Sequence, residues 1–353
     1  MKKDKMPKND EKHKEELLKS ILSRSLSSKN PSEETITKAH ENSNSYFHDL
    51  KERLLNEYQD KTLDDIKGSE IIETDSGETL KITQKEKIDF KIKKCDFKKE
   101  LYKDLTIIPT IGEITAEKLK KEGYKNILSL LEHERYSKLA LLAIEKIDQS
   151  SFSETFHMIR KNSYSQNNVL KCANAIENEN FKFMDIETLG LSNVPIILIG
   201  VAEIKGKYIK SSQYLLREKT EEPAILEGFS NHLDENSVYV TYNGARFDVP
   251  FIKNRFNYYR MDYPYESMIN YDLLYFARRL WRKQLPNCKL STVEKNIFDI
   301  ERKDDVPGSH IPGYYDTYLK EKNIGPLIPI IEHNRIDIVS LAKFLMKMCE
   351  EVY

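Results

Sequence analysis

The chain has 353 residues, of which 56 are Lys or Arg and 57 are Asp or Glu, so its formal net charge is −1. Charged residues make up 32%, above the roughly 25% of an average domain, and 12 glycines and 12 prolines are too few for collagen-like or low-complexity chains. The longest apolar run, Val194–Ala202, is shorter than the roughly 20 residues that cross a membrane, and the lysine-rich start lacks the apolar core of a signal peptide. The four cysteines are scattered, as in reduced intracellular proteins. We therefore expect a soluble cytoplasmic protein without a membrane partner.

Composition and hydrophobic pattern divide the chain into five segments. The first is rich in Lys, Ser, Asn and Glu and too poor in apolar residues to fold alone, which predicts a basic, disordered tail. The second combines a helical pattern with a short β-hairpin around the Asp-Ser-Gly turn of residues 75–77. The predicted organisation is a tail (1–45), a helix plus hairpin region (46–104), a pair of short helices (105–150), a connector (151–178) and an α/β domain (179–353).

Residues 105–131, LTIIPTIGEITAEKLKKEGYKNILSLL, predict a tight turn at Gly112 followed by two short helices, of which the second begins at Ile127. The first helix runs from about Thr115 to Glu122 and is stopped by a glycine. The segment resembles the helix-hairpin-helix of DNA repair and replication proteins, in which free backbone N–H groups at the turn bind a phosphate. The resemblance implies a phosphate contact at Gly112, to which Lys118 adds charge, although Thr110 stands where that family has a glycine. A helical packing module without a ligand is the alternative.

The pattern changes at residue 181 to that of an α/β domain. Three sequential strands are expected in FKFMDIE, PIILIGVAEI and KYIKSSQYLL, followed by alternating helices and strands and a long final helix over 326–350. This order predicts a mixed sheet with helices on its faces.

Four carboxylates stand out in this frame. Asp185 and Glu187 lie two residues apart on the first strand, so both side chains point to the same face. Asp248 opens a helix after a core strand, and Asp337 lies on the last helix with His333 one turn earlier. Anions gathered on one face are costly unless a cation binds them, and Mg²⁺ or Mn²⁺ prefers oxygen ligands on rigid elements. The pattern favours a site for two such ions. The alternatives are surface acids and, for Asp248, a helix cap.

The motifs DIET, NGARFD and HNRID, in this order and spacing, resemble the three exonuclease motifs of the DEDD superfamily of DnaQ-like 3′–5′ exonucleases. A closer resemblance to the YprB-type ribonuclease H-like family rests on residues 272–298, 305–315 and 327–342, and a preceding helix-hairpin-helix fits that family. The resemblance implies a ribonuclease H-like fold. It also implies catalytic roles for Asp185, Glu187, Asp248, His333 and Asp337, with the four carboxylates binding metal. His333 stands four residues before Asp337, a spacing at which one branch of the superfamily has a tyrosine.

Further residues are candidates for contact with nucleic acid. By resemblance, Thr188 and Leu189 lie near the terminal nucleotide, and Asn243 either contacts substrate or hydrogen-bonds its own turn. A cluster around Trp281 mixes cations with an aromatic ring, a composition suited to phosphates and stacked bases, although part of it is expected to face the core. Its cations are Arg278, Arg279 and Arg282.

The sequence thus predicts a metal-dependent hydrolase that acts on phosphodiester bonds of DNA or RNA, as a 3′–5′ exonuclease by resemblance. An endonuclease or structure-selective ribonuclease would use the same chemistry. A non-catalytic nucleic-acid-binding protein is the alternative from another class. The choice between DNA and RNA stays open, because recognition of the 2′-hydroxyl depends on the shape of the pocket.

Overall fold

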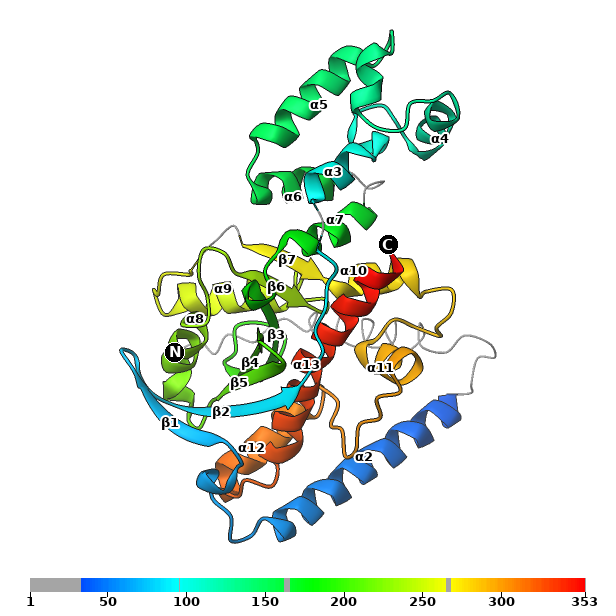
Figure 1. Cartoon of the computed structure of the whole chain (residues 1–353). Coiled ribbons are helices and arrows are strands. Elements are labelled where there is room, and N and C mark those ends of the chain that lie inside the picture. The colour runs from blue at the N-terminus through cyan, green and yellow to red at the C-terminus, as the bar shows by residue number, and fades with distance from the viewer. Residues whose placement is uncertain (1–32, 95, 162–165, 265–267, 353) are drawn as a thin grey trace, which may run out of the picture.

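The computed structural model describes residues 33–94, 96–161, 166–264 and 268–352. Figure 1 shows a small all-helical part, built from α3 to α7, standing above a larger part that contains the sheet. The predicted tail over residues 1–45 lies outside the described residues as far as residue 32, and helix α2 begins at Glu33. No helix within the described ranges is long and apolar enough to cross a membrane.

The larger part is organised around one mixed seven-stranded sheet with the order β1-β2-β5-β4-β3-β6-β7. The β3–β6 and β6–β7 pairs are parallel, and the other neighbours are antiparallel. This arrangement confirms the predicted α/β class with helices against a mixed sheet. The strands are β1 (Ser69–Thr74), β2 (Gly77–Lys87), β3 (Phe181–Thr188), β4 (Ile196–Lys205), β5 (Tyr208–Leu215), β6 (Val238–Thr241) and β7 (Ile269–Asp272).

Strand β4 explains why the centre of the sheet is dry on both faces. Every residue from Ile196 to Ile204 is buried, because helices cover both sides of this run, which is apolar apart from Glu203. Helix α13 packs against β3, β4 and β5, while α8 packs against β4 and β5 from another side. The helices are α2 (Glu33–Glu57), α3 (Phe97–Tyr102), α4 (Glu113–Lys121), α5 (Ser137–Gln149), α6 (Phe152–Lys161), α7 (Gln166–Cys172), α8 (Glu222–Ser230), α9 (Asp248–Tyr258), α10 (Leu273–Leu280), α11 (Leu290–Phe298), α12 (Ile311–Glu321) and α13 (Leu327–Glu351).

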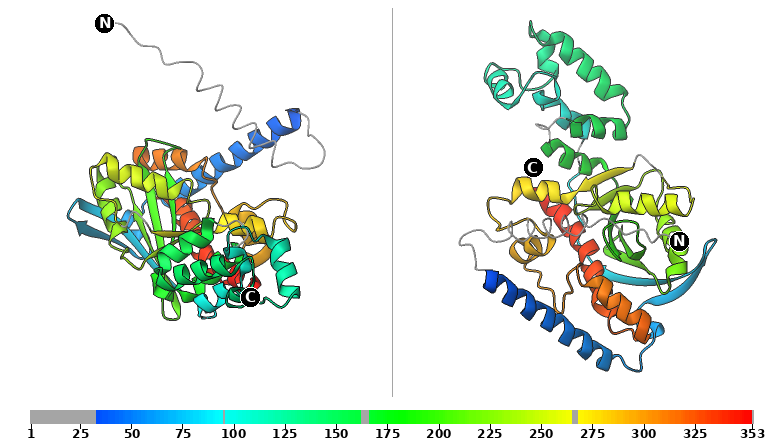
Figure 2. Two further views of the ribbon diagram at one scale, coloured as in Figure 1. Left: turned by 90° about the horizontal axis from the view of Figure 1, so that it is seen from above. Right: turned by 180° about the vertical axis from the view of Figure 1, so that it is seen from behind.

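The predicted N-terminal hairpin is present and belongs to the main sheet. Strand β2 pairs with β1 on one side and with β5 on the other, from Leu80↔Leu215 to Lys87↔Tyr208. Helix α2 comes close to α12 at one end and extends beyond it (Figure 2). The Tyr314 hydroxyl of α12 donates to the Phe47 carbonyl at 2.6 Å. Segments from the first quarter of the chain therefore complete the large part.

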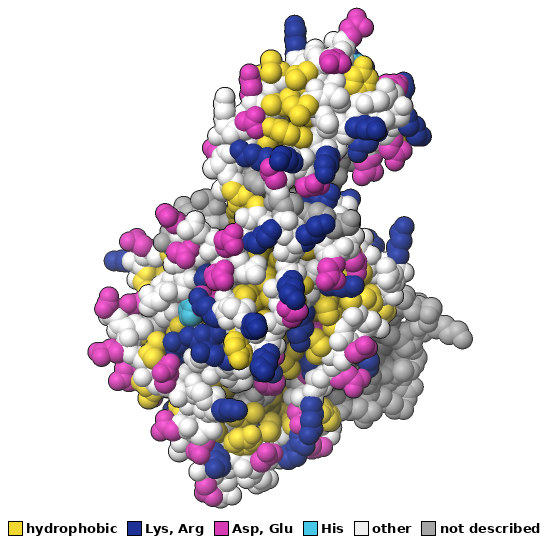
Figure 3. Space-filling view, viewed as in Figure 1, with side chains coloured by type: hydrophobic (Ala, Val, Ile, Leu, Met, Phe, Trp, Pro, Cys, Tyr) yellow, Lys and Arg dark blue, Asp and Glu magenta, His cyan; other side chains and the backbone are white. Residues whose placement is uncertain are grey.

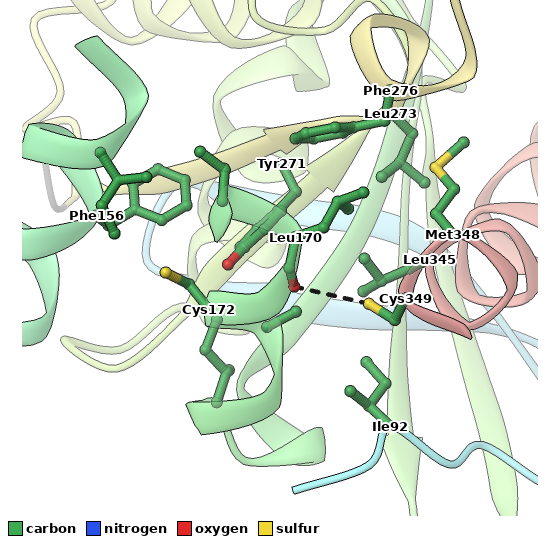
Figure 4. Close-up of a cluster of buried hydrophobic side chains, with 14 of the residues drawn as sticks. Ile92, Phe156, Leu170, Cys172, Tyr271, Leu273, Phe276, Leu345, Met348 and Cys349 are labelled. Atoms are coloured by element: carbon green, nitrogen blue, oxygen red, sulfur yellow. Dashed lines mark hydrogen bonds between the residues drawn. The ribbon is translucent and has the colours of Figure 1, made fainter. Parts of the chain in front are cut away.

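The small helical part packs against the sheet domain through apolar side chains. Figure 4 shows Phe156 of α6 and Leu170 of α7 beside Tyr271 of β7 and the end of α13. The Phe156 and Tyr271 rings lie 5.1 Å apart, and the Cys349 thiol of α13 donates to the Leu170 carbonyl at 3.8 Å. On its outer side, this part carries hydrophobic side chains that gather over α5 (Figure 3).

The turn closes from Ile108 to Ile111, and Gly112 is the extended N-cap residue of α4. The second predicted helix does not begin at residue 127. Helix α4 follows the turn, and a 3₁₀ turn over Leu128–Glu132 precedes α5. Thr110 has a φ of 79°, in the left-handed region that β-branched residues avoid and glycine enters freely. Thr110 therefore has a backbone conformation that glycine would adopt more readily.

Candidate active site

The fold brings the five predicted catalytic residues to one place. Asp185 and Glu187 share one face of β3 with Phe181 and Phe183, against which α13 packs. The backbone N–H of Ile186 donates to a carboxylate oxygen of Asp248 at 3.2 Å.

Helix α13 supplies the other two of these residues. The Nε2 atom of His333 lies 3.7 Å from a carboxylate oxygen of Glu187 and 3.7 Å from one of Asp337. The strand alternation and helical spacing seen in the sequence therefore converge at the carboxyl end of β3.

The cluster carries more negative charge than its surroundings neutralise. Burial raises the pKa of Asp185 well above its usual range, and the charges of Asp337, Asp248 and Glu187 raise it further. Burial also raises the pKa of Glu187 well above its usual range, with Asp337 and Asp248 adding to the shift. Burial raises the pKa of Asp248 to about 7, although it accepts the Ile186 N–H. Such shifts mark carboxylates that would be stabilised by a bound cation.

Asp248 is not a helix cap. It is the first residue of α9, and Phe247 occupies the cap position without a side-chain hydrogen bond. Asp272 stabilises the loop before Asp248. Its carboxylate oxygens accept the backbone N–H groups of Asn243 at 2.8 Å and Ala245 at 3.2 Å. Asn243 has a φ of 67°, so this residue shapes the turn itself. The loop therefore presents Asp248 toward β3.

Asp185 is held by an asparagine that sequence reasoning missed. The Asn334 amide donates to the Asp185 carbonyl at 3.1 Å and to its carboxylate at 3.0 Å, while Gln213 donates to the Asn334 oxygen at 3.0 Å. This packing requires Gly200, which faces Asp185 across the strand pair, because a Cβ there would lie 2.0 Å from the Asn334 Oδ1 atom. One glycine therefore lets α13 reach the carboxylate.

His333 is oriented by the carboxylate of Asp305, a residue that was not among the predicted site residues. Its Nδ1 atom lies 2.6 Å from a carboxylate oxygen of Asp305, which leaves Nε2 on the side of Glu187 and Asp337. Burial lowers the pKa of His333, but the hydrogen bond to Asp305 and the charge of Asp337 outweigh burial and raise it.

The same loop provides a cation. The Arg302 guanidinium contacts Asp337 and makes two bonds to the fully buried Glu294, at 2.7 and 2.8 Å. Burial raises the pKa of Asp337, against the opposing charges of His333 and Arg302. Arg302 therefore compensates one side of the cluster, whereas Asp185 has no cation partner among the described residues' ion pairs.

Other predicted residues lie elsewhere or act locally. The Thr188 hydroxyl donates to the Gly190 carbonyl at 2.7 Å, and Leu189 packs against the apolar core. Trp281 is buried and donates to Glu351, as expected for the core-facing part of its cluster. The three cations predicted to bind nucleic acid near Trp281 are exposed, and no ion pair or hydrogen bond among the described residues joins them to the acidic carboxylates. They are Arg278, Arg279 and Arg282.

Gly112 and Lys118 lie in the small helical part, away from the acidic cluster. Gly112 lines a cavity of about 850 Å³ between the turn at residues 106–112 and helices α5 and α6. Lys118 is exposed and lies 3.8 Å from Glu122 on its own helix.

The chemistry of the donors fits a divalent cation, although their present spacing is not that of a closed metal site. Within the described ranges, no group of three or more His, Cys, Asp or Glu side chains is drawn together closely enough to hold an ion. The unneutralised charge of Asp185, Glu187 and Asp248 is nevertheless the condition that an oxygen-binding cation relieves.

Comparison with known proteins relates the sheet domain to a known family. Residues 182–349 match the model described as RNase_H superfamily. The chain is also 32% identical over 206 residues to YprB of Bacillus subtilis (strain 168), an uncharacterized protein. That alignment covers 57% of the chain and 50% of YprB, so the chain matches about half the length of this relative. The two proteins are homologous, and the domain of residues 182–349 belongs to the RNase H superfamily.

Proposed function

We propose that this protein is a metal-dependent nuclease that hydrolyses phosphodiester bonds, acting as a 3′–5′ exonuclease. The observation that carries the proposal is the buried, poorly neutralised set of Asp185, Glu187, Asp248 and Asp337. Membership in the RNase H superfamily supports phosphodiester chemistry. The 3′–5′ polarity rests on the resemblance to DEDD exonucleases alone.

In this proposal the four carboxylates hold two Mg²⁺ or Mn²⁺ ions. Such ions, when bound, lower the pKa of a water molecule and stabilise the developing charge on phosphate oxygens. Asn334 keeps the Asp185 carboxylate in place, and Asp272 keeps the loop before Asp248 in place. Arg302 keeps Asp337 turned toward the loop of residues 299–305 until a cation competes for it.

His333 would handle the proton of the attacking water. Its Nε2 atom faces Glu187 and Asp337, and Asp305 holds Nδ1. A histidine held by an acid in this way keeps one nitrogen aimed at the reaction site, which is how general bases are positioned.

The small helical part would supply binding to the nucleic-acid backbone. The turn over residues 106–112 lines the cavity of about 850 Å³ together with Lys146 and Lys161. Backbone N–H groups at the start of α4 and two lysines suit a phosphate.

The test is a gel time course on 5′-labelled single-stranded DNA and RNA with Mn²⁺, Mg²⁺ or EDTA. The wild type is compared with Asp185→Asn plus Asp248→Asn, and with Asp316→Asn, an exposed acid of α12 paired with Lys320. A metal-dependent ladder that shortens from the 3′ end, lost only in the double variant, is the expected result.

Two other outcomes would change the assignment. Internal cuts in these substrates or in duplexes and hybrids would favour an endonuclease or a structure-selective ribonuclease. Binding without cleavage of any substrate would make the protein a nucleic-acid-binding protein and would overturn the proposal.

A further inference from the structure

A cavity of about 390 Å³ lies between the small helical part and the sheet, and nothing in the proposed chemistry uses it. Helix α6 contributes Arg160, the loop before α9 contributes Arg246, and the β7–α10 corner contributes Asn270, Asp272, Tyr275 and Phe276. Phe156 and Phe276, which Figure 4 shows on either side of Tyr271, also line it. A volume of this size is within the range of small-ligand sites, which is roughly 300–1,000 Å³.

The cavity is lined by two cations that have no partner of their own. The side chains of Arg160 and Arg246 are exposed, and neither guanidinium group has an ion pair or a hydrogen bond within the described part of the chain. The Asp272 carboxylate lies in the same cavity, but it accepts the N–H groups of Asn243, Ala245 and Leu274. Guanidinium groups without a protein partner favour a phosphate as ligand.

The remaining wall offers what a nucleobase needs. Tyr275 is 53% exposed although its ring contacts Phe276 edge-on, with centroids 5.8 Å apart. Asn270 is only 9% exposed, and its oxygen accepts from Thr241 at 3.0 Å. Its Nδ2 atom has no hydrogen-bond partner within the described residues. Because buried donors are nearly always paired, an unpaired amide beside a cavity points to an acceptor on a ligand.

The loop before α9 connects the cavity to Asp248 of the acidic cluster. Arg246 precedes Asp248 by two residues and also lines a second cavity of about 180 Å³, on the side of Leu191 and Tyr258. Arg246 thus lines both cavities, which lie on either side of the segment that leads to Asp248.

We infer that the 390 Å³ cavity binds one nucleotide of a single-stranded nucleic acid, next to the nucleotide that is cleaved. Its phosphate would contact Arg160 and Arg246, and its base would stack on Tyr275 with Asn270 as a donor. The small helical part thereby contributes Arg160 to the substrate groove of the sheet domain. This inference rests on the proposed function, because it takes a nucleic acid as the substrate.

The experiment measures binding without cleavage. Fluorescence anisotropy is recorded for labelled oligothymidylate and oligouridylate on an Asp185→Asn background, alone and with Arg160→Ala or Tyr275→Ala. Each added substitution is expected to weaken binding about tenfold. The two differ in salt dependence, because Arg160→Ala lowers the slope of log affinity against log salt by about 0.7, whereas Tyr275→Ala leaves it unchanged. Matched controls are Arg135→Ala and Tyr208→Ala, two exposed side chains outside the cavity, for which no change is expected.

Photocrosslinking of 5-iodouracil oligonucleotides, followed by mapping of the crosslinked peptide, provides a second measurement. A crosslink at Tyr275 is expected. Unchanged affinity in both cavity variants, or crosslinks only at other sites, would overturn the inference while cleavage by the wild type still supports the nuclease. Wild type that binds and crosslinks at Tyr275 but cleaves nothing would support the subsite and refute the nuclease.

Discussion

Two buried polar clusters lie at opposite ends of the same two strands, and they handle charge in opposite ways. Near the start of β3, Lys182 lies 2.6 Å from Glu203 of β4, and Glu203 also contacts His232 at 2.8 Å. The Tyr214 hydroxyl completes this network through His232. Near the end of β3, Asp185 and Glu187 face further acids.

The pKa shifts record the difference between the two clusters. Burial alone raises the pKa of Glu203, but hydrogen bonds and charge from His232 and Lys182 outweigh it and lower the pKa below its usual range. The pKa values of Asp185, Glu187 and Asp248 are all raised. Buried charge is thus neutralised within the network at one end of β3, whereas negative charge accumulates at the other end.

The largest effect expected from this contrast is on cleavage by Asp185→Asn. We expect activity to fall more than about 100-fold, because losing even a supporting partner of a metal ligand costs about 10–100-fold. The free energy of unfolding should stay equal or rise, since the change removes one of several repelling charges. Cleavage rates and urea unfolding of the same preparation measure both quantities. A variant that loses stability in step with activity would contradict the comparison.

The mirror experiment is Glu203→Gln. Removing this carboxylate leaves Lys182 buried without its counter-charge, which should lower the free energy of unfolding by about 3 kcal/mol. Cleavage below the melting temperature should be unchanged, because the network lies at the far end of β3. Lost cleavage at full stability would show that the two ends are coupled.

Addition of a metal ion distinguishes the two clusters without any substitution in the acidic one. If the carboxylates hold Mn²⁺ or Mg²⁺, an ion at 100 times its dissociation constant should stabilise the fold by about 2.7 kcal/mol. The same ion should stabilise Glu203→Gln equally and should leave Asp185→Asn plus Asp248→Asn unaffected. Thermal unfolding with and without the ion is the measurement, and stabilisation of the double variant would place the ion elsewhere.

Gly200→Ala tests how the acidic cluster is assembled. The added methyl group would collide with Asn334, so α13 must shift, at a cost of about 1–3 kcal/mol. Cleavage should fall as well, because Asn334 holds the Asp185 carboxylate. Ala202→Gly, also a small residue of β4, is the matched control and should spare cleavage.

The smallest expected effect is a pH dependence of the free energy of unfolding that arises from Glu203. Because folding lowers the pKa of Glu203, this group stabilises the protein above its unfolded pKa of about 4.3, and the contribution is lost as the pH falls below that value. The difference in unfolding free energy between wild type and Glu203→Gln should therefore shrink from about pH 6 to about pH 3. A constant difference would mean that the charge of Glu203 contributes nothing.

Local periodicity was enough to predict most of the sheet domain. The alternation in β3 placed Asp185 and Glu187 on one face, and the helical spacing placed His333 with Asp337. The same signals located the hairpin and the long final helix.

The supporting residues of the site carried no such signal. Arg302 and Asp305 lie in a charged loop without periodicity, and their contacts with α13 join residues 28 to 35 positions apart. Asn334 looked like an ordinary polar residue of a helix, and only the close approach over Gly200 gives it a role. Helices α11 and α12 were not predicted either.

The pairing of β2 with β5 has a consequence for anyone who would isolate the domain that matches the RNase H superfamily. The family match begins at residue 182, yet Leu80 and Ile82 of β2 are fully buried in the core of that domain. A fragment that begins near residue 179 would leave β5 as an open edge with a row of unpaired backbone groups. Such an edge invites pairing between molecules, so the fragment should aggregate, whereas a fragment that retains residues 69–87 keeps the edge covered.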